Sequence, residues 1–338
     1  MNNFAKLAAD ERRAYVEETA NRRNSTNTAI EKDFWVCWTL RHLFSLQGVP
    51  QMCFKGGTSL SKVFGLIHRF SEDIDVSLDR AALGFTGKRD LADKALSNTE
   101  RRQLDKQLRE AIQAEVTTKI LPQLAQSFES VMGKTGWELK PSTEAGEEMT
   151  LLFSYPNAFE YTAYIRPQIK IEFGRGDQWP SKEFPISPYV TEEFPDIFTI
   201  PNAVVPVLDS QRTFWEKVTL LHAEHHRPDP PALKLRMSRH WSDIAVMSTD
   251  EKFATEKLDL TLLSASAYSL TLTPLGSPSS AYTVSGTYAG PIDYVNYRLF
   301  NGPENFDISS MTISAPEPSS LALIGLGSAG LLYFRRRK

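Results

Sequence analysis

The sequence predicts an α+β fold, in which a small mixed β-sheet is flanked by helices and followed by a Ser/Thr/Gly-rich segment of β or irregular structure and a short apolar helix. Segments that alternate with period two are mixed with segments whose apolar residues recur every three or four positions, without a regular βαβ repeat. After residue 258 the composition changes, because residues 261–315 contain no lysine and are rich in Ser, Thr, Gly, Pro and Tyr. Residues 321–334 are apolar and precede Arg335-Arg336-Arg337-Lys338.

These changes predict three parts: a globular domain at 1–257, a low-charge segment at 258–315 and a tail at 316–338. The net charge of −3 excludes a global basic field, so any nucleic-acid contact requires a local patch. Cys37 and Cys53 lie in apolar patterns, which favours reduced thiols in a cytoplasmic protein. The first residues lack an apolar signal core, so we expect a cytoplasmic chain whose tail could anchor to the inner membrane. The apolar stretch is shorter than the roughly 20 residues that span a bilayer.

The first half of the chain contains clear periodic segments. Apolar residues at spacings of three and four predict a buried helix over 31–47, and a short strand over 51–54 follows. Gly56-Gly57 predicts a sharp turn before a helix over 60–67 that Thr58 or Ser59 would cap. Alternation predicts a strand over 73–78, and a stripe of apolar residues predicts a long helix over 99–131, bent at Pro122.

Further along, strands are predicted near 137–139, 149–155 and 161–173. A Pro-rich connection over 184–206 then leads to a helix that begins at Asp209 or Ser210 and ends near His225. A last helix is predicted over 234–247. In the low-charge segment, the alternating residues 282–284 and 294–297 indicate short strands between turns.

The Gly-Gly turn is the first candidate for a functional site. Glycine lets the backbone turn tightly and approach a ligand closely, and the start of a helix offers free N–H groups to phosphate. The hydroxyls of Thr58 and Ser59 would add donors. Alone, this pattern is more often plain turn geometry.

Two carboxylates follow at the next strand. Asp73 and Asp75 are two positions apart, so they project from the same face, while Ile74 and Val76 project from the other. Adjacent carboxylates repel each other unless a cation lies between them, and hard oxygen ligands together with substrate phosphates suit Mg²⁺. An isolated Asp-x-Asp can also be an exposed edge strand, but its combination with the Gly-Gly turn favours a nucleotide and metal site.

A third carboxylate could complete this site. In residues 167–173, Ile169 and Ile171 share one face of a strand and Lys170 and Glu172 share the other. If this strand lies beside 73–78, Glu172 joins Asp73 and Asp75 as a metal ligand; otherwise it is part of a solvent-facing charged strand.

These residues resemble the AbiE-type (AbiEii) nucleotidyltransferase toxin family of the polymerase-β-like superfamily. The resemblance rests on the Gly-Gly-Thr-Ser turn, on Arg69-x-Ser71-x-Asp73-Ile74-Asp75, and on the strand that holds Glu172. The segments 212–217 and 239–244 resemble the remaining two motifs of the family. The similarity covers roughly residues 30–247, and helical residues that normally follow are replaced by the low-charge segment, so the helical part is expected to be truncated.

The resemblance implies a nucleotidyltransferase toxin of a toxin–antitoxin, abortive-infection system that transfers a nucleotide from an NTP to RNA, with a tRNA 3′ end as the expected acceptor. It also implies Mg²⁺ as cofactor and a cognate antitoxin as partner. Asp73 and Asp75 would bind the metal and act in catalysis with Lys217 and Asp243. The nucleotide would contact residues of the turn, of the following segment and of the later helix: Gly56, Gly57, Thr58, Ser59, Ser71 and Lys217. From the residues alone, Lys217 and Asp243 would be ordinary polar positions on helices.

The tail resembles the PEP-CTERM sorting signal, with Pro316-Glu317-Pro318, an apolar stretch and an Arg-rich end. This resemblance supports an alternative to the toxin: a non-enzymatic, sorted surface protein whose tail would contact the membrane. A degenerate domain that only binds nucleotide or antitoxin is a further alternative.

Overall fold

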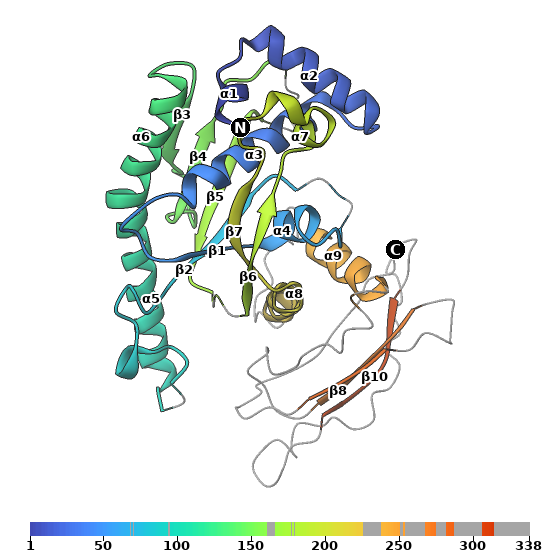
Figure 1. Cartoon of the computed structure of the whole chain (residues 1–338). Helices are drawn as coiled ribbons and strands as arrows, with labels where there is room; N and C mark the ends of the chain where they lie inside the picture. Colours follow the sequence, from blue (N-terminus) through green and yellow to red (C-terminus); the bar gives the residue numbers. More distant parts are fainter. Residues whose placement is uncertain are drawn as a thin grey trace. The chain divides into compact units, whose positions relative to one another are not determined.

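The computed structural model describes residues 1–67, 69, 71–93, 95–160, 166–176, 178, 180–225, 238–250 and 253, together with strands at 268–274, 282–286 and 306–313. The chain forms two compact units, Met1–Asp209 and Ser210–Lys338, which we describe separately (Figure 1). The compositional boundary predicted near residue 257 lies within the second unit.

A seven-stranded sheet forms the centre of the first unit, in the order β3-β4-β5-β2-β1-β7-β6. Its strands are β1 (Met52–Lys55), β2 (Ile74–Leu78), β3 (Glu138–Pro141), β4 (Thr150–Ser154), β5 (Gln168–Gly174), β6 (Ser181–Ile186) and β7 (Ala203–Leu208). β2 pairs in parallel with β5 and β1 pairs in parallel with β7, whereas the other neighbours are antiparallel. The predicted mixed sheet flanked by helices is confirmed.

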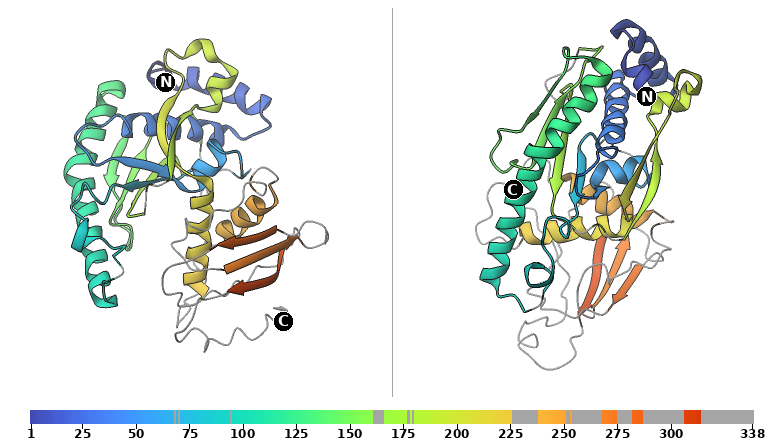
Figure 2. Two further views of the ribbon diagram at one scale, coloured as in Figure 1. Left: turned by 60° about the horizontal axis from the view of Figure 1, so that its bottom comes forward. Right: turned by 60° about the vertical axis from the view of Figure 1, so that its left-hand side comes forward.

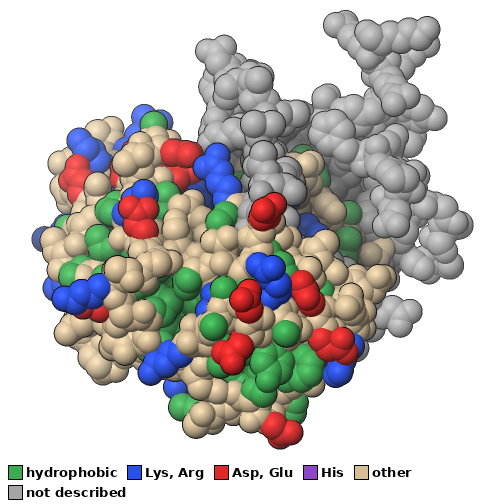
Figure 3. Space-filling view, turned by 90° about the horizontal axis from the view of Figure 1, so that it is seen from above, with side chains coloured by type: hydrophobic (Ala, Val, Ile, Leu, Met, Phe, Trp, Pro, Cys, Tyr) green, Lys and Arg blue, Asp and Glu red, His purple; other side chains and the backbone are tan. Residues whose placement is uncertain are grey.

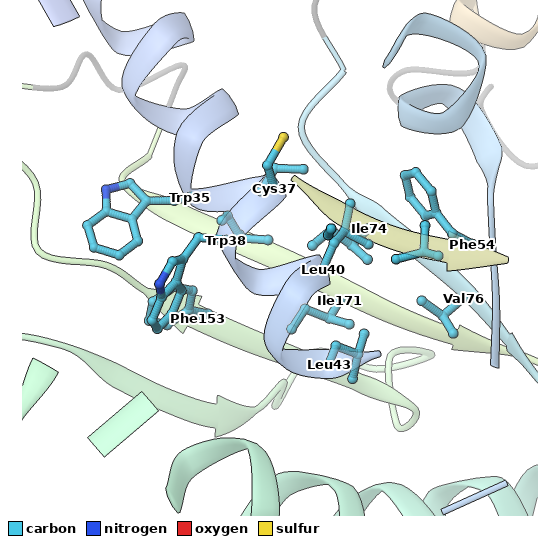
Figure 4. Close-up of a cluster of buried hydrophobic side chains, with 14 of the residues drawn as sticks. Trp35, Cys37, Trp38, Leu40, Leu43, Phe54, Ile74, Val76, Phe153 and Ile171 are labelled. Carbon is cyan, nitrogen blue, oxygen red and sulfur yellow. The ribbon is translucent and has the colours of Figure 1, made fainter. Parts of the chain in front are cut away.

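Helix α3 (Asn27–Leu43) supplies much of the core. Its Trp35, Trp38, Leu40 and Leu43 lie against the side chains of the strands, including the fully buried Ile74 (Figure 4). The predicted helix is confirmed, although it begins four residues earlier. Its apolar face packs on the sheet because burial of large apolar side chains is the main favourable term in folding.

The remaining helices of the first unit cover the sheet. α1 (Asn2–Ala5) and α2 (Ala9–Arg22) precede α3. The predicted long helix is a rod made of α5 (Asn98–Glu115), a π-helical turn (Val116–Ile120) and α6 (Leu121–Met132), and α6 contacts β3 and α3 (Figure 2). Pro122 lies in the first turn of α6, directly after the π-helical turn, where its missing N–H is tolerated.

Two predictions require correction. The helix after the Gly-Gly turn is α4 (Gly56–Lys62), which begins at the glycine itself; its N-cap is Lys55, and neither Thr58 nor Ser59 caps it. The Pro-rich connection contains β6, α7 (Tyr189–Glu193), a 3₁₀ turn (Pro195–Ile197) and β7. Pro185 is compatible with β6 because β6 is an edge strand, which needs no partner on its outer side.

In the second unit, α8 (Ser210–His225) and α9 (Ser238–Thr249) confirm the two predicted helices. The first residues predicted for the second helix, 234–237, lie outside the described residues. β8 (Tyr268–Pro274), β9 (Tyr282–Gly286) and β10 (Phe306–Ile313) form an antiparallel sheet in the order β10-β8-β9. β9 matches the alternation at 282–284, whereas 294–297 and the apolar stretch at 321–334 lie outside the described residues. Among the described residues, no helix is both long and apolar enough to cross a membrane.

Candidate functional site

The Gly-Gly turn and Asp75 touch each other. Gly56, which directly follows β1 and begins α4, has a φ of +82°, in the left-handed region that favours glycine. A Cβ added to Gly56 would lie 1.9 Å from Asp75 Oδ2, so the carboxylate occupies the space that any other side chain would need. The sequence predicted that carboxylate and turn belong to one site, and the structure brings these two residues together.

The second glycine has its own neighbours. A Cβ at Gly57 would lie 2.9 Å from Ser71 Oγ and 3.0 Å from Arg69 Nη2. Gly56 thus faces a carboxylate of β2, whereas Gly57 faces two polar groups of the segment that precedes β2. Ser71 was a predicted nucleotide contact, whereas Arg69 was recognised only as part of a motif. Its guanidinium carries the donor geometry that suits phosphate.

The two hydroxyls that follow the glycines are directed into the protein. Thr58 donates to the carbonyl oxygen of Asp73 at 2.5 Å and lies 3.0 Å from Ser71 Oγ. Ser59 donates to the carbonyl oxygen of Gly56 at 2.9 Å. Both side chains are buried, so in this structure they fix the turn against the 71–73 segment. Their predicted contact with phosphate remains a prediction.

Strand register places a row of polar residues across the sheet. Asp75 is the register partner of Lys55 on β1 and of Glu172 on β5, and Glu172 is the partner of Thr150 on β4. Register partners project from the same face of a sheet. Because the neighbouring Ile74 packs on the α3 side, this polar row lies on the opposite face (Figure 4).

Glu172 forms an ion pair with Lys170. Its carboxylate lies 2.5 Å from Lys170 Nζ, which also lies 2.6 Å from Glu147. Burial lowers the pKa of Lys170, but its two carboxylate partners outweigh this effect and raise the pKa above its ordinary value. The predicted sharing of one face by Lys170 and Glu172 is thus accompanied by a direct ion pair.

The described residues form no preformed metal cage, because no group of three His, Cys, Asp or Glu side chains among them could hold a metal ion. Asp75 lies against Gly56, and the carbonyl oxygen of Asp73 accepts a hydrogen bond from Thr58. The predicted Mg²⁺ site remains a prediction; Mg²⁺ commonly takes one or two carboxylates and completes its coordination with substrate phosphates and water. Glu172 is adjacent by register, but its carboxylate is paired with Lys170.

The later motif residues lie in the second unit and contact each other. Lys217 on α8 and Asp243 on α9 form an ion pair with an Nζ–Oδ2 distance of 3.0 Å. Both are buried, at 7% and 1% exposure, so Lys217 is not the solvated lysine that its sequence context alone indicated. On the same helix, Phe214, Val218 and Leu221 are also buried.

The sequence interpretation missed Lys55 as a neighbour of Asp75. Lys55 directly precedes Gly56 at the end of β1 and is the register partner of Asp75. A lysine at the end of a strand before a Gly-Gly turn was a usable signal, but its pairing with Asp75 depends on the antiparallel register of β1 and β2.

The face on which α2 and α7 lie carries mixed charge. Figure 3 views the molecule from this side, and acidic and basic side chains are interspersed on it. Arg23 lies 2.9 Å from Glu192, and Arg22 lies 3.7 Å from Glu193. The described residues of this face therefore form no basic patch of the kind that RNA binding would require.

Comparisons with known proteins identify two sequence families. The family described as nucleotidyl transferase AbiEii toxin, type IV TA system, matches residues 38–305, which extends beyond the motifs that end near residue 247. The PEP-CTERM protein-sorting motif matches residues 314–338. No curated protein matches the chain. Among solved structures, the chain is similar to MenT4, a nucleotidyltransferase toxin from Mycobacterium tuberculosis H37Rv, with 20% identity, a TM-score of 0.39, and coverage of 75% of this chain and 67% of that one.

Proposed function

Because this chain belongs to the AbiEii nucleotidyl transferase toxin family of type IV toxin–antitoxin systems, we propose that it transfers a nucleotide from an NTP to RNA with Mg²⁺ as cofactor. Family membership supports nucleotidyltransferase activity, a nucleotide substrate and a cognate antitoxin. The Mg²⁺ requirement and the acceptor, a tRNA 3′ end, are parts of the proposal.

One observation carries the proposal: Asp75 Oδ2 lies directly against Gly56, within 1.9 Å of where a Cβ would stand. A triphosphate that approaches the backbone of the turn would therefore come close to the carboxylate of Asp75. Glycine leaves the backbone accessible, and the carboxylate attracts a cation that offsets the charge of the phosphates. Arg69, whose guanidinium lies beside Gly57, and Lys55, the register partner of Asp75, add positive charge next to the turn.

In the proposed reaction, a hydroxyl of the acceptor RNA attacks the α-phosphorus of the NTP, and pyrophosphate leaves. Mg²⁺ bound by Asp73 and Asp75 would neutralise charge on the phosphates. The glycine turn orients the triphosphate, and Ser71 and Arg69, which face Gly57, donate hydrogen bonds to its oxygens. Lys217 would steady the triphosphate and Asp243 would act with it.

The direct test is incubation of the purified full chain with each labelled NTP, Mg²⁺ and total tRNA, followed by separation of RNA from protein. Label on tRNA that disappears with EDTA is the expected result. Label on protein would show a different acceptor, and NTP binding without any transfer would identify a degenerate domain. If the folded chain neither transfers nor binds any NTP, the proposed function is wrong.

The sorting motif favours a second candidate, a sorted protein defined by its tail. Fractionation of cells that express the full chain separates the two. A stable membrane or extracellular pool would support the sorted protein, and recovery in the soluble fraction alone would count against it.

A further inference from the structure

Three consecutive charged residues are buried in the apolar helix α3. Glu31, Lys32 and Asp33 are 1%, 3% and 4% exposed, and the helix around them packs into the core. Removing a charge from water costs several kcal/mol unless a well-placed partner compensates. Such a run at the start of a core helix therefore requires specific partners, and the structure provides them.

Lys32 binds the segment that carries the predicted site. Its Nζ lies 2.6 Å from Glu72 Oε2 and donates to the carbonyl oxygen of Arg166 at 3.1 Å. Glu72 stands between Ser71 and Asp73, the residues that face the glycine turn and carry the first carboxylate. Glu72 therefore links this partly buried ion pair directly to its two chain neighbours, the site residues Ser71 and Asp73.

The position of Glu72 in the chain indicates what this contact does. Residues 71–73 lie directly before β2, which begins at Ile74, and Lys32 binds this segment from α3 through Glu72. Holding Glu72 against α3 therefore fixes the backbone from which Ser71 and Asp73 project. On the site side, the hydrogen bond from Thr58 to the Asp73 carbonyl fixes the same segment to α4.

The next residue of α3, Asp33, makes a similar contact to α4, the helix that begins at the glycine turn. Asp33 lies 2.8 Å from Lys62 Nζ, at the end of α4, and accepts a hydrogen bond from the backbone of Tyr189 at 2.7 Å. Burial lowers the pKa of Lys62, but the attraction of Asp33 outweighs burial and raises the pKa above its ordinary value, so the lysine stays charged. Two adjacent residues of one rigid helix thus hold α4 and the 71–73 segment.

We propose that Lys32, acting through Glu72, is a positioning residue that orients Ser71 and Asp73, with Asp33 holding α4 through Lys62. The proposal rests on the proposed function, because it assigns these residues to the geometry of that site. Lys32 does not itself touch the reacting groups. Misplacement of a reacting group by about 1 Å can cost about 100-fold in rate, so an ion pair behind the site is sufficient to control it.

The test uses the double variant Lys32→Met/Glu72→Gln in the full chain. It removes both charges, so neither is left buried without a partner, and the protein is expected to fold. We expect kcat to fall about 10- to 100-fold and the Mg²⁺ concentration for half-maximal transfer to rise, while KM for the acceptor stays near that of the wild type. Hydrogen exchange of the 69–75 amides should accelerate, and exchange of β4 should stay unchanged.

The matched control is Arg23→Met/Glu192→Gln, which removes an ion pair of similar length, 2.9 Å, between α2 and α7. It should change neither kcat nor exchange at 69–75. If the Lys32 and Glu72 double variant folds with wild-type kinetics, or with wild-type exchange at 69–75, the proposal is wrong. Should the double variant fail to fold, Glu72→Gln alone, at the more exposed partner, gives the same readouts.

The two proposals fail differently. If the wild type transfers no nucleotide, the proposed function falls, and the role assigned to Lys32 falls with it even where exchange at 69–75 accelerates. If the wild type is active and the variant keeps its kinetics, only the positioning role is overturned.

Discussion

Lys217 and Asp243 form a buried ion pair between α8 and α9, with 3.0 Å between Nζ and Oδ2. Nothing in the local pattern of either helix indicates that these two residues meet, since 25 residues separate them in the chain. The pair joins the two later motifs of the family into one structural feature of the second unit. Its energetic role and its functional role can be separated by experiment.

Single substitutions of this pair should be costly. Lys217→Met or Asp243→Leu leaves one buried charge without its partner, which typically costs about 3–5 kcal/mol. The double variant should recover most of this loss because it leaves no charge behind. Urea unfolding of all four proteins measures the cycle. If the double variant regains stability but no nucleotide transfer, the residues act in the reaction; if both return, the pair is structural.

Asp75→Asn should reduce nucleotide transfer by about 100-fold or more, because a carboxylate that binds the metal contributes several kcal/mol to the transition state. Asparagine keeps the shape of the side chain, so the unfolding curve should be nearly unchanged. Asp79→Asn, just beyond the end of β2, is the matched control and should keep full activity. Equal activity of Asp75→Asn and wild type would exclude Asp75 from the site.

Gly56→Ala tests the contact with Asp75. The new Cβ would lie 1.9 Å from Asp75 Oδ2, so the carboxylate must move and activity should fall severely. Gly48→Ala is the control, because Gly48 also has positive φ, +69°, but has no atom within 4 Å of the new Cβ. Both variants should lose roughly 1–2 kcal/mol from backbone strain. Only Gly56→Ala should lose activity in the transfer assay.

Glu172→Gln and Glu147→Gln separate the two partners of Lys170. If Glu172 contributes to the metal site, its substitution should raise the Mg²⁺ concentration for half-maximal transfer by about tenfold, in the range seen for groups around a metal. Glu147→Gln removes the other carboxylate on Lys170 and should leave this concentration near the wild-type value. A Mg²⁺ titration of activity compares them. Identical titrations would show that Glu172 is only an ion-pair partner.

His42 should make stability depend on pH. Burial, and then the nearby Arg41 and N-terminus, lower the pKa of His42 from 6.5 to about 4. Between pH 6.5 and 4 the unfolded chain therefore binds a proton that the folded chain does not, so stability falls as pH falls through this window. The full contribution, present above pH 6.5, is about 3 kcal/mol. The contacts of its ring nitrogens with Ser127 and Asn2 fit the neutral form.

The check is urea unfolding at pH 7.5 and 4.5. His42→Gln keeps a donor and an acceptor without titrating, so its loss of stability between the two pH values should be smaller than that of the wild type. An equal loss in both proteins would show that other groups cause the acid sensitivity.

Local patterns were sufficient for much of the fold. Spacing of apolar residues identified α3, the α5–α6 rod and α8, and alternation identified β2 and the paired face of Lys170 and Glu172. The prediction of a Pro-rich connection without strands was wrong, because β7 pairs with the distant β1 and β6 pairs with β7. This pairing overrides a local composition that disfavours strands. Likewise, Thr58 and Ser59 have the chemistry of N-caps, but their hydroxyls find partners in the folded turn.

For the site, the sequence by itself provided the ingredients, a glycine turn followed by Asp73 and Asp75, although β2 begins at Ile74 and leaves Asp73 just before the strand. Only the tertiary structure decided that Asp75 fills the space next to Gly56 and that Glu172 is the register partner of Asp75. It also decided that Glu172 pairs with Lys170, and that Lys32 of α3 binds Glu72. The physical reason is that period and backbone freedom are local properties of a few neighbouring residues. Strand register and the pairing of buried charges are settled when segments far apart in the chain pack together.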